Sequence, residues 1–591
     1  MSVALKLKKS EKGQIWQFLP YDEERAQNFS RLFDIPFIVA RILAARGLAD
    51  DTIEDFLFPK LKNLMPSPFI LKDMEKAVQV IFSAVQNQEI IGIFGDYDVD
   101  GGTSSAILKK YFDMLGVKTF VHIPDRMTEG YGPNIEAFRK LAQMGASTVI
   151  TVDCGSAAPD VMALAREDGL KTVILDHHLT AGETEGADAT VNPNRMDDLS
   201  ELGDLTAAGV CFLFCVAMNK ICRDNNYFID NSLKEPNLFS LLDLSALGTI
   251  CDVAPITGLN RALVAQGLRV LQHGSNLGLR ELSRIGRVTE NIGTYHCGFV
   301  LGPRINAGGR VGRASAGFEL LTTECPISAT RLAEELDHYN TERKATEDTI
   351  KSEAISQIEN QKLYHDPVII AYSSAWHPGI VGIVASRIKE NYHKPTFILG
   401  GDGDVLKGSG RSISGVDIGS AVKKAAEQNL ILGGGGHKMA AGLTVREDQI
   451  QYLRDFFRAE LSKDVEAARA NASIKVDAEL PLVAANFALF NALEKLQPFG
   501  VGNPSPVFCL RNVQVSFFKI IGENHLKVTF TDSSRVTLQA VCFRCMDQPL
   551  AKLLMQKEQK IDVLGALKRD TYHTGDNVQF IIEDVSLADI F

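Results

Sequence analysis

The chain has 591 residues, which is too many for one hydrophobic core and suits three or four domains. Hydrophobic residues make up 45% and charged residues 23%, an ordinary balance for a soluble globular protein. The net charge of −11 argues against a protein coated in basic surface for non-specific DNA binding, although local basic residues still allow a nucleic-acid enzyme.

The sequence contains no clear signal for export, for membrane insertion or for a cysteine-bound metal. The first residues contain no long apolar run, so we expect no signal peptide. The longest uncharged stretch, Leu205–Asn219, is too short to span a bilayer and predicts a buried helix. Of 10 cysteines, Cys542 and Cys545 form a C-x-x-C in an alternating strand pattern, which would send them to opposite faces. Because no second pair lies at zinc spacing, we expect free thiols and a cytoplasmic, reducing location.

Residues 1–75 predict a small helical cap. From there to about residue 315, helices alternate with short apolar strands, and the rhythm predicts a parallel sheet with helices on both faces. We expect Thr103 and Ser104 to cap a helix that ends at Leu115. The other expected helices are Met74–Gln86 and Asn134–Met144, and the expected strands are Ile90–Phe94, Val117–Ile123, Thr148–Val152 and Thr172–Leu175.

The second half of the chain begins with a long charged stretch, Ile327–Leu363, that is almost free of Gly and Pro. It predicts one long connecting helix, with a two-helix hairpin as the alternative. Residues 367 to about 461 predict a second α/β unit. From about Ala472 onward the pattern alternates at period two, which predicts an all-β region folded as a small barrel.

The chain's chemistry is concentrated first in Ile91–Gly102, an apolar strand followed by Asp96, Asp98 and Asp100. Alternation by two would place the three carboxylates on one face of an extended segment. Like charges repel unless a cation lies among them, and hard divalent cations prefer carboxylate oxygen. By itself this stretch favours a metal site only slightly over a solvated acidic turn.

The same design recurs along the chain. Asp153 follows a second apolar strand, Asp176 follows a third together with His177 and His178, and Asp252 ends a fourth apolar segment that is a helix or a short strand. In a parallel α/β sheet, ligands bind outside the carboxyl ends of the strands. We therefore expect these side chains to converge on one pocket.

These motifs resemble the four signatures of the DHH phosphoesterase superfamily. Two later segments, Leu301–Arg310 and Pro498–Pro504, together with the glycine-rich Gly433–Gly442, narrow the resemblance to the RecJ family of bacterial single-strand-specific 5′ exonucleases. The resemblance runs from the first strand to the C-terminus. It implies two α/β domains, DHH and DHH-associated, joined by a long helix around a cleft, and a C-terminal oligonucleotide-binding barrel.

The resemblance also implies a centre of two divalent ions, Mn²⁺ or Mg²⁺, with imidazole favouring Mn²⁺. Asp98 would bind one ion and Asp100 the other, Asp153 would bridge them, and His177 and Asp252 would complete the ligand set of the second ion. His178 is expected to contact phosphate or to act as a proton partner. Asp96 and Asp176 are expected to orient the ligands, although Asp96 could instead bind metal itself.

Two basic segments predict contacts to phosphate. Arginine donates paired hydrogen bonds to phosphate, and glycines let backbone amides approach an anion. The alternatives are a solvated basic loop for the first segment and a tight turn for the second. Trp376 and His377 either lie near the second segment or, for Trp376, belong to the core. The candidate DNA contacts are Arg304, Asn306, Arg310 and Arg313 in the first segment and Ser409, Arg411, Ser412 and His437 in the second.

The sequence thus predicts a metal-dependent 5′→3′ exonuclease that releases 5′-mononucleotides from single-stranded DNA in recombination and repair. Alternatives are a phosphodiesterase for short oligonucleotides or cyclic dinucleotides, and a non-catalytic single-strand clamp. The resemblance suggests a single-strand-binding protein and a helicase as partners, and we expect a monomer. The expected domains are 1–75 (cap), 76–315 (DHH), 316–365 (connecting helix), 366–465 (DHH-associated) and 466–591 (barrel).

Overall fold

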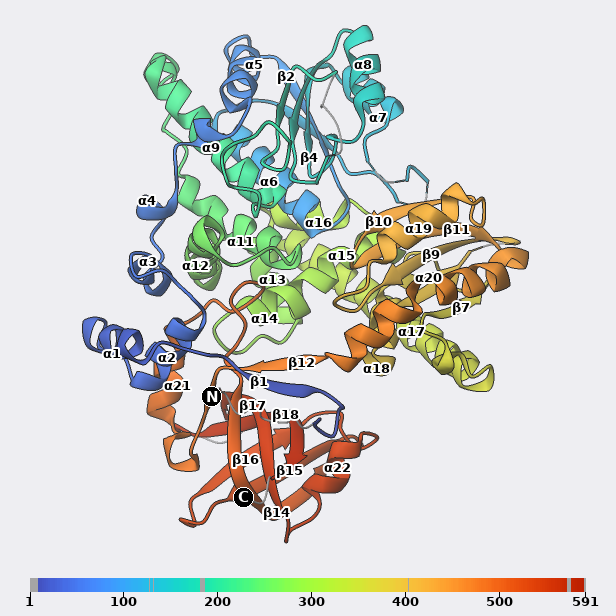
Figure 1. Cartoon of the computed structure of the whole chain (residues 1–591). Coiled ribbons are helices and arrows are strands. Elements are labelled where there is room, and N and C mark those ends of the chain that lie inside the picture. The colour runs from blue at the N-terminus through green and yellow to red at the C-terminus, as the bar shows by residue number, and fades with distance from the viewer. Residues whose placement is uncertain are drawn as a thin grey trace. The chain divides into compact units, whose positions relative to one another are not determined.

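The computed structural model describes residues 9–126, 128–130, 132–180, 186–401, 403–570 and 575–588 (Figure 1). The chain forms two compact units. The parallel-sheet unit comprises Phe58–Thr349 and Pro498–Asn503, and the barrel unit comprises Met1–Leu57, Ile350–Gln497 and Pro504–Phe591. Among the described residues, no helix has the length and apolar character needed to cross a membrane.

The parallel-sheet unit is built on five strands in the order β3-β2-β4-β5-β6, all parallel. Their bounds are β2 Ile90–Gly95, β3 Thr119–His122, β4 Ala146–Val152, β5 Lys171–Leu175 and β6 Ala189–Val191. The predicted parallel α/β architecture is confirmed. All of β4 except Ser147 is buried, as expected for a strand covered on both faces.

Helices complete this unit. They are α4 Leu61–Leu64, α5 Met74–Gln86, α6 Val99–Met114, α7 Ile135–Gln143, α8 Pro159–Glu167, α9 Ala207–Asp224, α10 Tyr227–Asp230, α11 Leu242–Cys251, α12 Gly258–His273, α13 Leu277–Ile285, α14 Thr294–His296, α15 Gly302–Val311 and α16 Ala316–Thr322. A π-helical turn, Cys297–Leu301, joins α14 to α15. Helix α17, Pro326–Asn360, is one unbroken helix that continues into the barrel unit, so the hairpin alternative is wrong.

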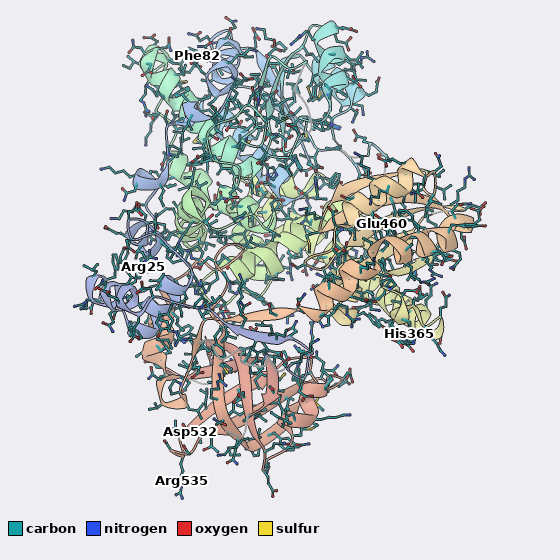
Figure 2. All side chains as sticks on the ribbon, in the orientation of Figure 1. Arg25, Phe82, His365, Glu460, Asp532 and Arg535 are labelled. Atoms are coloured by element: carbon teal, nitrogen blue, oxygen red, sulfur yellow. The ribbon has the colours of Figure 1, made fainter. Side chains whose placement is uncertain are left out.

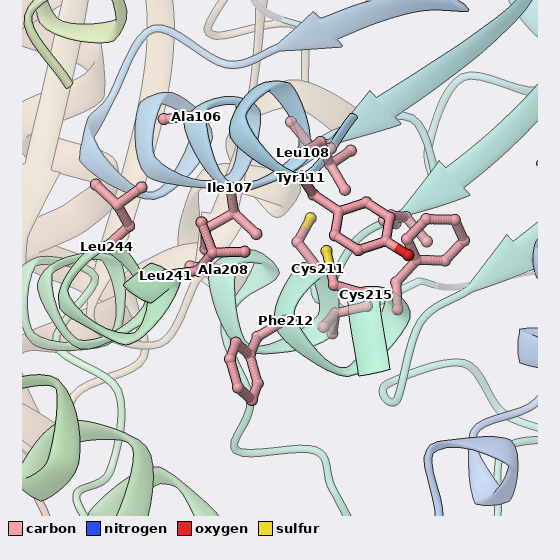
Figure 3. Packing of buried hydrophobic residues seen from close by; sticks show 14 of the residues in the cluster. Ala106, Ile107, Leu108, Tyr111, Ala208, Cys211, Phe212, Cys215, Leu241 and Leu244 are labelled. Atoms are coloured by element: carbon pink, nitrogen blue, oxygen red, sulfur yellow. The ribbon is translucent and has the colours of Figure 1, made fainter. Parts of the chain in front are cut away.

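The core of the parallel-sheet unit lies where α6, α9 and α11 pack together. Figure 3 shows Ile107 and Tyr111 of α6 beside Cys211 and Cys215 of α9, with Leu244 of α11 close by. The Tyr111 hydroxyl donates to Oδ1 of Asn219 at 2.9 Å, which pairs the buried polar groups of two helices. The predicted buried helix at Leu205–Asn219 is thus confirmed as α9.

The barrel unit contains a second α/β sheet in the order β10-β11-β9-β8-β7, of which only β7 and β8 are parallel. Its strands are β7 Ile369–Ser373, β8 Thr396–Gly400, β9 Val405–Arg411, β10 Gly433–His437 and β11 Ala440–Arg446, and its helices are α18 Val381–Tyr392, α19 Ile418–Glu427 and α20 Ile450–Ala470. The glycine run of the sequence is therefore an edge strand rather than a turn.

The C-terminal strands close into a five-stranded barrel, β14-β15-β16-β18-β17, because β17 also pairs with β14. The strands are β13 Ala478–Glu479, β14 Phe508–Ile521, β15 His525–Thr531, β16 Thr537–Cys542, β17 Lys560–Arg569 and β18 Val578–Leu587. Figure 2 labels the turn between β15 and β16, where Oδ1 of Asp532 accepts from the Ser534 amide. The predicted barrel is confirmed, but the region is not all-β: it also contains α21 Phe487–Glu494 and α22 Pro549–Leu554.

The N-terminal segment belongs to the barrel unit. It contains α1 Glu23–Leu32, α2 Phe37–Ala45 and α3 Ile53–Leu57, but also β1 Ile15–Phe18, which a purely helical cap did not anticipate. Strand β1 pairs in parallel with β12, Ser473–Val476. The indole Nε1 of Trp16 donates to Oδ2 of the buried Asp584 at 3.0 Å.

Two local predictions are wrong. Helix α6 begins at Val99 and not at Thr103, because Asp98 caps it through the amide of Gly101 at 3.0 Å. Cys545 lies beyond the end of β16 and not within a strand, and its thiol donates to the carbonyl of Cys542 at 3.4 Å. Both cysteines are buried free thiols, as predicted, but they do not face opposite sides of a strand.

Candidate metal centre

The three aspartates after β2 do not lie along an extended segment, as the sequence predicted. Asp96 is in the loop, where its Oδ1 accepts from the Tyr97 amide at 2.7 Å, and Asp98 is the cap of α6. Asp100 lies in the first turn of that helix. The chain therefore turns around the site, and the carboxylates approach it from a loop, a cap and a helix.

Asp100 is held by the beginning of another helix. Its Oδ2 accepts from the Ala207 amide at 2.7 Å and its Oδ1 from the Ala208 amide at 3.1 Å, both in the first turn of α9. Free amides and the helix dipole favour an anion at this position. Gly248 of α11 packs so closely that a Cβ there would lie 2.6 Å from Oδ1 of Asp100.

Asp153 follows β4 in a left-handed backbone conformation, with φ of 60°. Aspartate adopts this region more readily than most residues, but at a cost in energy that functional sites often carry. Gly155 has φ of 113°, and a Cβ there would lie 2.6 Å from Oγ1 of Thr151. The tight turn after β4 thus fixes the direction of the Asp153 side chain. The neighbouring Cys154 is buried, which raises the pKa of its thiol and suits a packing role behind Asp153.

The carboxylate of Asp176 accepts hydrogen bonds from the two residues that follow it and from Ser156. Oδ1 accepts from the His177 amide at 2.7 Å and from Nδ1 of His178 at 2.8 Å, while Oδ2 accepts from the Ser156 amide at 3.1 Å. Burial would raise the pKa of Asp176, but these hydrogen bonds and the charge of His178 lower it well below its ordinary value. Asp176 therefore orients the histidines, which is the arrangement expected of a residue behind metal ligands.

Two residues that the sequence analysis missed also hold the histidines. Nδ2 of Asn192 donates to the carbonyl of His178 at 2.9 Å, and Nδ2 of Asn194 donates to the carbonyl of His177 at 2.6 Å. Both follow β6. Their bonds go to main-chain carbonyls, so no motif of chemically reactive residues marks them.

Asp252 is the C-cap of α11, which settles its element as a helix. The loop that follows is supported by the segment Pro498–Asn503, since the Ile256 amide donates to the carbonyl of Val501 at 2.7 Å. Arg261, which is 1% exposed, donates to the carbonyl of Pro498 at 3.1 Å. This segment thus steadies the loop after Asp252.

These side chains converge on one cluster. Nε2 of His177 lies 3.2 Å from Asp153, 3.7 Å from Asp100 and 3.8 Å from Asp252. Donor atoms about 2.1 Å from an octahedral ion are about 3 Å apart, so these separations suit ligands of one cation. The same Nε2 is buried and has no hydrogen-bond partner among the described residues. A metal ion satisfies such an atom, and the residues therefore fit a metal.

A second group adjoins the first. Asp96, Asp98 and Asp153 lie with one oxygen each within 4.8 Å of one another, while Asp100, His177 and Asp252 meet the same limit as a separate group. Asp153 contacts both groups through its approach to His177, the position expected of a bridging carboxylate. Asp96 lies beside Asp98 and Asp153 and is therefore a further candidate ligand.

The carboxylates of the cluster have raised pKa values, because they are buried and lie close to one another. Burial, reinforced by neighbouring carboxylates, raises the pKa of Asp96, Asp100 and Asp252 to about 7 and raises that of Asp153 well above its ordinary value. His178 has its pKa raised to about 9 by its hydrogen bond to Asp176. Like charges in a buried site are stabilised when a divalent cation joins them.

Three residues of the first basic segment, Arg304, Asn306 and Arg310, lie on helix α15 and not in a loop, whereas Arg313 follows the helix. Arg304 pairs with Asp337 at 2.8 Å, and Arg313 pairs with Glu319 and Glu335, so both arginines also have structural partners.

Arg310 on the same helix is different. Burial and the nearby Arg126 lower its pKa to about 10, while the charges of Asp98 and Tyr97 raise it. Arg310 and Arg126 therefore lie in the electrostatic field of the metal cluster, and Arg126 had not been predicted.

Asn306 is half-buried on α15, and Gly309 packs against Tyr97, where a Cβ would lie 3.0 Å from the Tyr97 carbonyl. Helix α15 thus rests on the loop that carries Asp96 and Asp98. This contact explains the glycine at position 309.

The second basic segment forms a cluster within the barrel unit. Arg411 donates to Oγ of Ser409 at 2.9 Å, and a Cβ on Gly382 of α18 would lie 2.9 Å from that Oγ. The exposed His437 and Arg411 both stand opposite Ala440 in the strand registers. Ser412 is 1% exposed and donates to the carbonyl of Val416 at 2.7 Å, so its hydroxyl serves its own turn.

Trp376 belongs to the core of the barrel unit. It is 3% exposed, and its Nε1 donates to Glu353 at 2.6 Å. His377 accepts from the Gly379 amide through Nδ1 at 3.1 Å. Of the two interpretations of Trp376, the structure supports the core.

Three family models match the chain: the DHH family N-terminal domain over residues 90–249, the DHHA1 domain over 365–463 and the RecJ OB domain over 476–584. The chain is 31% identical over 586 residues to the single-stranded-DNA-specific exonuclease RecJ of Bacillus subtilis (strain 168), covering 97% of this chain and 71% of that protein. It is 34% identical over 504 residues to the protein of the same name from Dickeya dadantii (strain 3937), covering 84% and 86%.

Solved structures agree. RecJ from Thermus thermophilus in complex with Mn²⁺ matches with a TM-score of 0.78 at 27% identity, covering 97% of this chain and 79% of that chain. The corresponding complex with Mg²⁺ matches with a TM-score of 0.71 at 26% identity, covering 97% and 78%.

Proposed function

Since the chain belongs to the RecJ family of single-stranded-DNA-specific exonucleases, we propose that it degrades single-stranded DNA in the 5′→3′ direction and releases 5′-mononucleotides. The observation that carries the chemistry is the buried, unbonded Nε2 of His177 facing three carboxylates in the described structure. Family membership supplies the substrate, and the side-chain cluster supplies the means of cutting a phosphodiester.

The cofactor is Mn²⁺ or Mg²⁺, and we propose two ions. Asp98 and Asp153, with Asp96 as a further candidate, would hold one, and Asp100, Asp153, His177 and Asp252 would hold the other. When bound, divalent ions of this kind activate water and relieve charge at the phosphate. The protein's own part is to keep the ligands rigid, through the α9 amides on Asp100 and through Asp176 and two asparagines on the histidines.

His178 and Arg310 would act on the DNA itself. Because the pKa of His178 is raised to about 9, its ring carries a proton at neutral pH and can donate to a phosphate oxygen. Arg310 adds a buried positive charge beside the same cluster. Among the remaining predicted contacts in and just after α15, Asn306 stays a candidate, while Arg304 and Arg313 must exchange an ion pair in order to reach DNA.

We further propose that Ser409, Arg411 and His437 bind the 5′-terminal phosphate. The first turn of α18 packs against this cluster at Gly382, so helix amides, a hydroxyl and a guanidinium are available to one anion. Ser412 contributes to the shape of the turn and not to the contact.

The proposals about cellular role, location and partners rest on membership of the family. We propose a role in recombination and repair, a cytoplasmic location, a monomer, and a single-strand-binding protein and a helicase as partners. We also propose that the chain works as the five segments expected from its sequence, with limits at residues 75, 315, 365 and 465.

The test is a nuclease assay with Mn²⁺ on a 5′-labelled single strand and on a blunt duplex. We expect the wild type to release the labelled mononucleotide from the single strand only. Asp153→Asn should lower the rate at least about 100-fold, because the carboxylate between the two groups is lost. The matched control is Asp160→Asn, which changes the same charge on an exposed residue of α8 and should leave the rate within about twofold.

If the Asp153→Asn variant cleaved as fast as the wild type, the proposed metal centre would be wrong. Cleavage of dinucleotides but not of longer strands would indicate a small-substrate phosphodiesterase. Binding of single strands without cleavage would indicate a clamp.

A further inference from the structure

A cavity of about 840 Å³ opens on the barrel unit, and its lining contains none of the candidate site residues described above. Its lining is formed by residues 9–14 before β1, the loop before α19 and the last turns of α20, together with the residue that follows α18. The charged and titratable residues in the lining are Lys9, Lys12, His393, Asp464 and Arg469.

The lining is electropositive. Lys9 and Lys12 from the stretch before β1 and Arg469 from α20 bring three cations to the lining, which contains one carboxylate, Asp464. Within the described part of the chain, none of the three cations forms a side-chain hydrogen bond or an ion pair. Partial burial and the charges of Lys12 and Arg469 lower the pKa of His393, which shows that these cations act on the same space.

One further acid lies within reach of these cations. Burial raises the pKa of Glu583 on β18, and the charge of Lys12 lowers it. With three cations and one acid, the lining itself has an excess of positive charge, in a chain whose net charge is −11. Concave sites with uncompensated charge concentrate ions of the opposite sign.

The residues of the lining indicate which class of anion the cavity would bind. Its three cations lie on two segments, the stretch before β1 and the last turns of α20, so they can contact more than one negative group. None of the lining residues is a Phe, Tyr or Trp, and His393 is the one aromatic ring in the lining, so the lining offers charge for phosphates more than rings for bases. Two glycines of the lining, Gly13 and Gly415, have backbones in the left-handed region. Because they have no side chains, a ligand's backbone can approach the protein closely at these positions.

We propose that this cavity binds the sugar–phosphate backbone of single-stranded DNA, through side chains other than those of the metal centre and of the Arg411 cluster. The choice of DNA as the ligand rests on the proposed function. A free polyphosphate offers the same chemistry and is tested as a competing ligand.

The experiment measures binding of a fluorescent oligothymidylate of about 20 nucleotides by anisotropy, in EDTA so that no cleavage occurs. Each phosphate contact contributes about 0.7 to the slope of log Kd against log salt for single strands. Lys12→Gln combined with Arg469→Gln should therefore lower that slope by about 1.4 and weaken binding about tenfold at low salt. With metal restored, KM should rise and kcat should stay within about twofold.

The matched control is Lys140→Gln combined with Lys423→Gln. These lysines are exposed on α7 and α19, and neither has an ion pair among the described residues. The control removes the same charge, so it should leave the slope unchanged. If the double variant of the cavity fails to fold, Arg469→Gln alone should lower the slope by about 0.7.

Two results would overturn the inference. One is a slope and affinity for the oligothymidylate that match the control's, which would mean that the cations only balance the C-terminal end of α20. The other is inorganic tripolyphosphate that binds the wild type but not the cavity variant, while strand binding is equal in both. Failure of the proposed function would look different, because then the wild type would bind the strand but not cut it after metal is restored.

Discussion

Single residues in this protein show how burial sets charge. Asp243 in the first turn of α11 is 1% exposed, and burial raises its pKa to about 6. Its Oδ1 accepts from the Leu244 amide at 2.8 Å. Unlike the aspartates of the cluster, it has no histidine or candidate metal partner in the described structure.

Asp243→Asn should therefore stabilise the protein, and more so at high pH. The folded state holds a proton that the unfolded state releases near pH 3.8, so wild-type stability is lost as the pH rises from about 4 through 6. Relative to the wild type, the variant's free energy of unfolding should grow by about 1.4 kcal/mol between pH 5 and pH 8. Thermal unfolding at the two pH values measures this. An advantage that is independent of pH would show that the carboxyl is not titrating in this range.

At the residue scale, the sequence was informative where chemistry and position coincide. An aspartate at the end of each apolar segment could be recognised because parallel strands end at one edge. Asn192, Asn194 and Arg126 could not, since their roles come from contacts between distant segments. The burial of Ser412 likewise depends on a turn whose geometry the sequence does not state.

At the scale of helices and strands, the position of an element's first residue was the hardest to predict. The start of α6 was placed four residues late, because Gly101 and Gly102 are poor helix formers and are typical of a turn. In the structure the Asp98 cap and the buried packing of α6 outweigh that preference. Long periodic elements such as α17, and strands that are fully apolar, were predicted closely, because their signal extends over many residues.

Gly101 and Gly102 offer a matched pair for a test. A Cβ on Gly101 would lie 2.5 Å from the carbonyl oxygen of Asp96, whereas a Cβ on Gly102 would meet nothing within 4 Å. Gly101→Ala should displace the loop that holds Asp96 and Asp98, and a shift of about 1 Å costs about 100-fold in rate. Gly102→Ala should retain activity within about twofold and stabilise α6 by about 0.5–1 kcal/mol.

The nuclease rate and the Mn²⁺ affinity of each variant check this prediction. Equal effects of the two substitutions would show that the close approach of Gly101 to Asp96 has no part in shaping the site.

At the scale of the whole molecule, the barrel unit is assembled from three separate stretches of the chain. The pairing of β1 with β12 was not predictable, because β1 has four residues and its partner lies far along the sequence. The architecture as a whole was predictable because the family resemblance covers it, and the comparisons confirm that resemblance.

Trp16→Ala tests this long-range pairing. Trp16 packs on a cluster around Val476, Cys509 and Leu564, and its loss also leaves Asp584 without the indole donor. We expect a cost of about 3 kcal/mol and a lower melting temperature. Gln17→Ala, on the exposed neighbour, should change stability by less than about 0.5 kcal/mol. Mn²⁺ affinity should be unchanged in both, since the ligands belong to the other unit, and a loss of affinity would contradict this division.

The same pairing fixes an order of events during synthesis. Strand β1 leaves the ribosome early, but its partner β12 follows only after roughly 450 more residues, which takes about 20–90 s at 5–20 residues per second. Throughout that interval the N-terminal strand has an unpaired edge, which is a site for aggregation or for capture by a chaperone. The parallel-sheet unit, by contrast, has all of its strands by residue 191. The candidate metal ligands, the last of which is Asp252, are therefore all translated while the first strand of the chain is still waiting for its partner, although the segment Pro498–Asn503 that steadies the Asp252 loop comes only later.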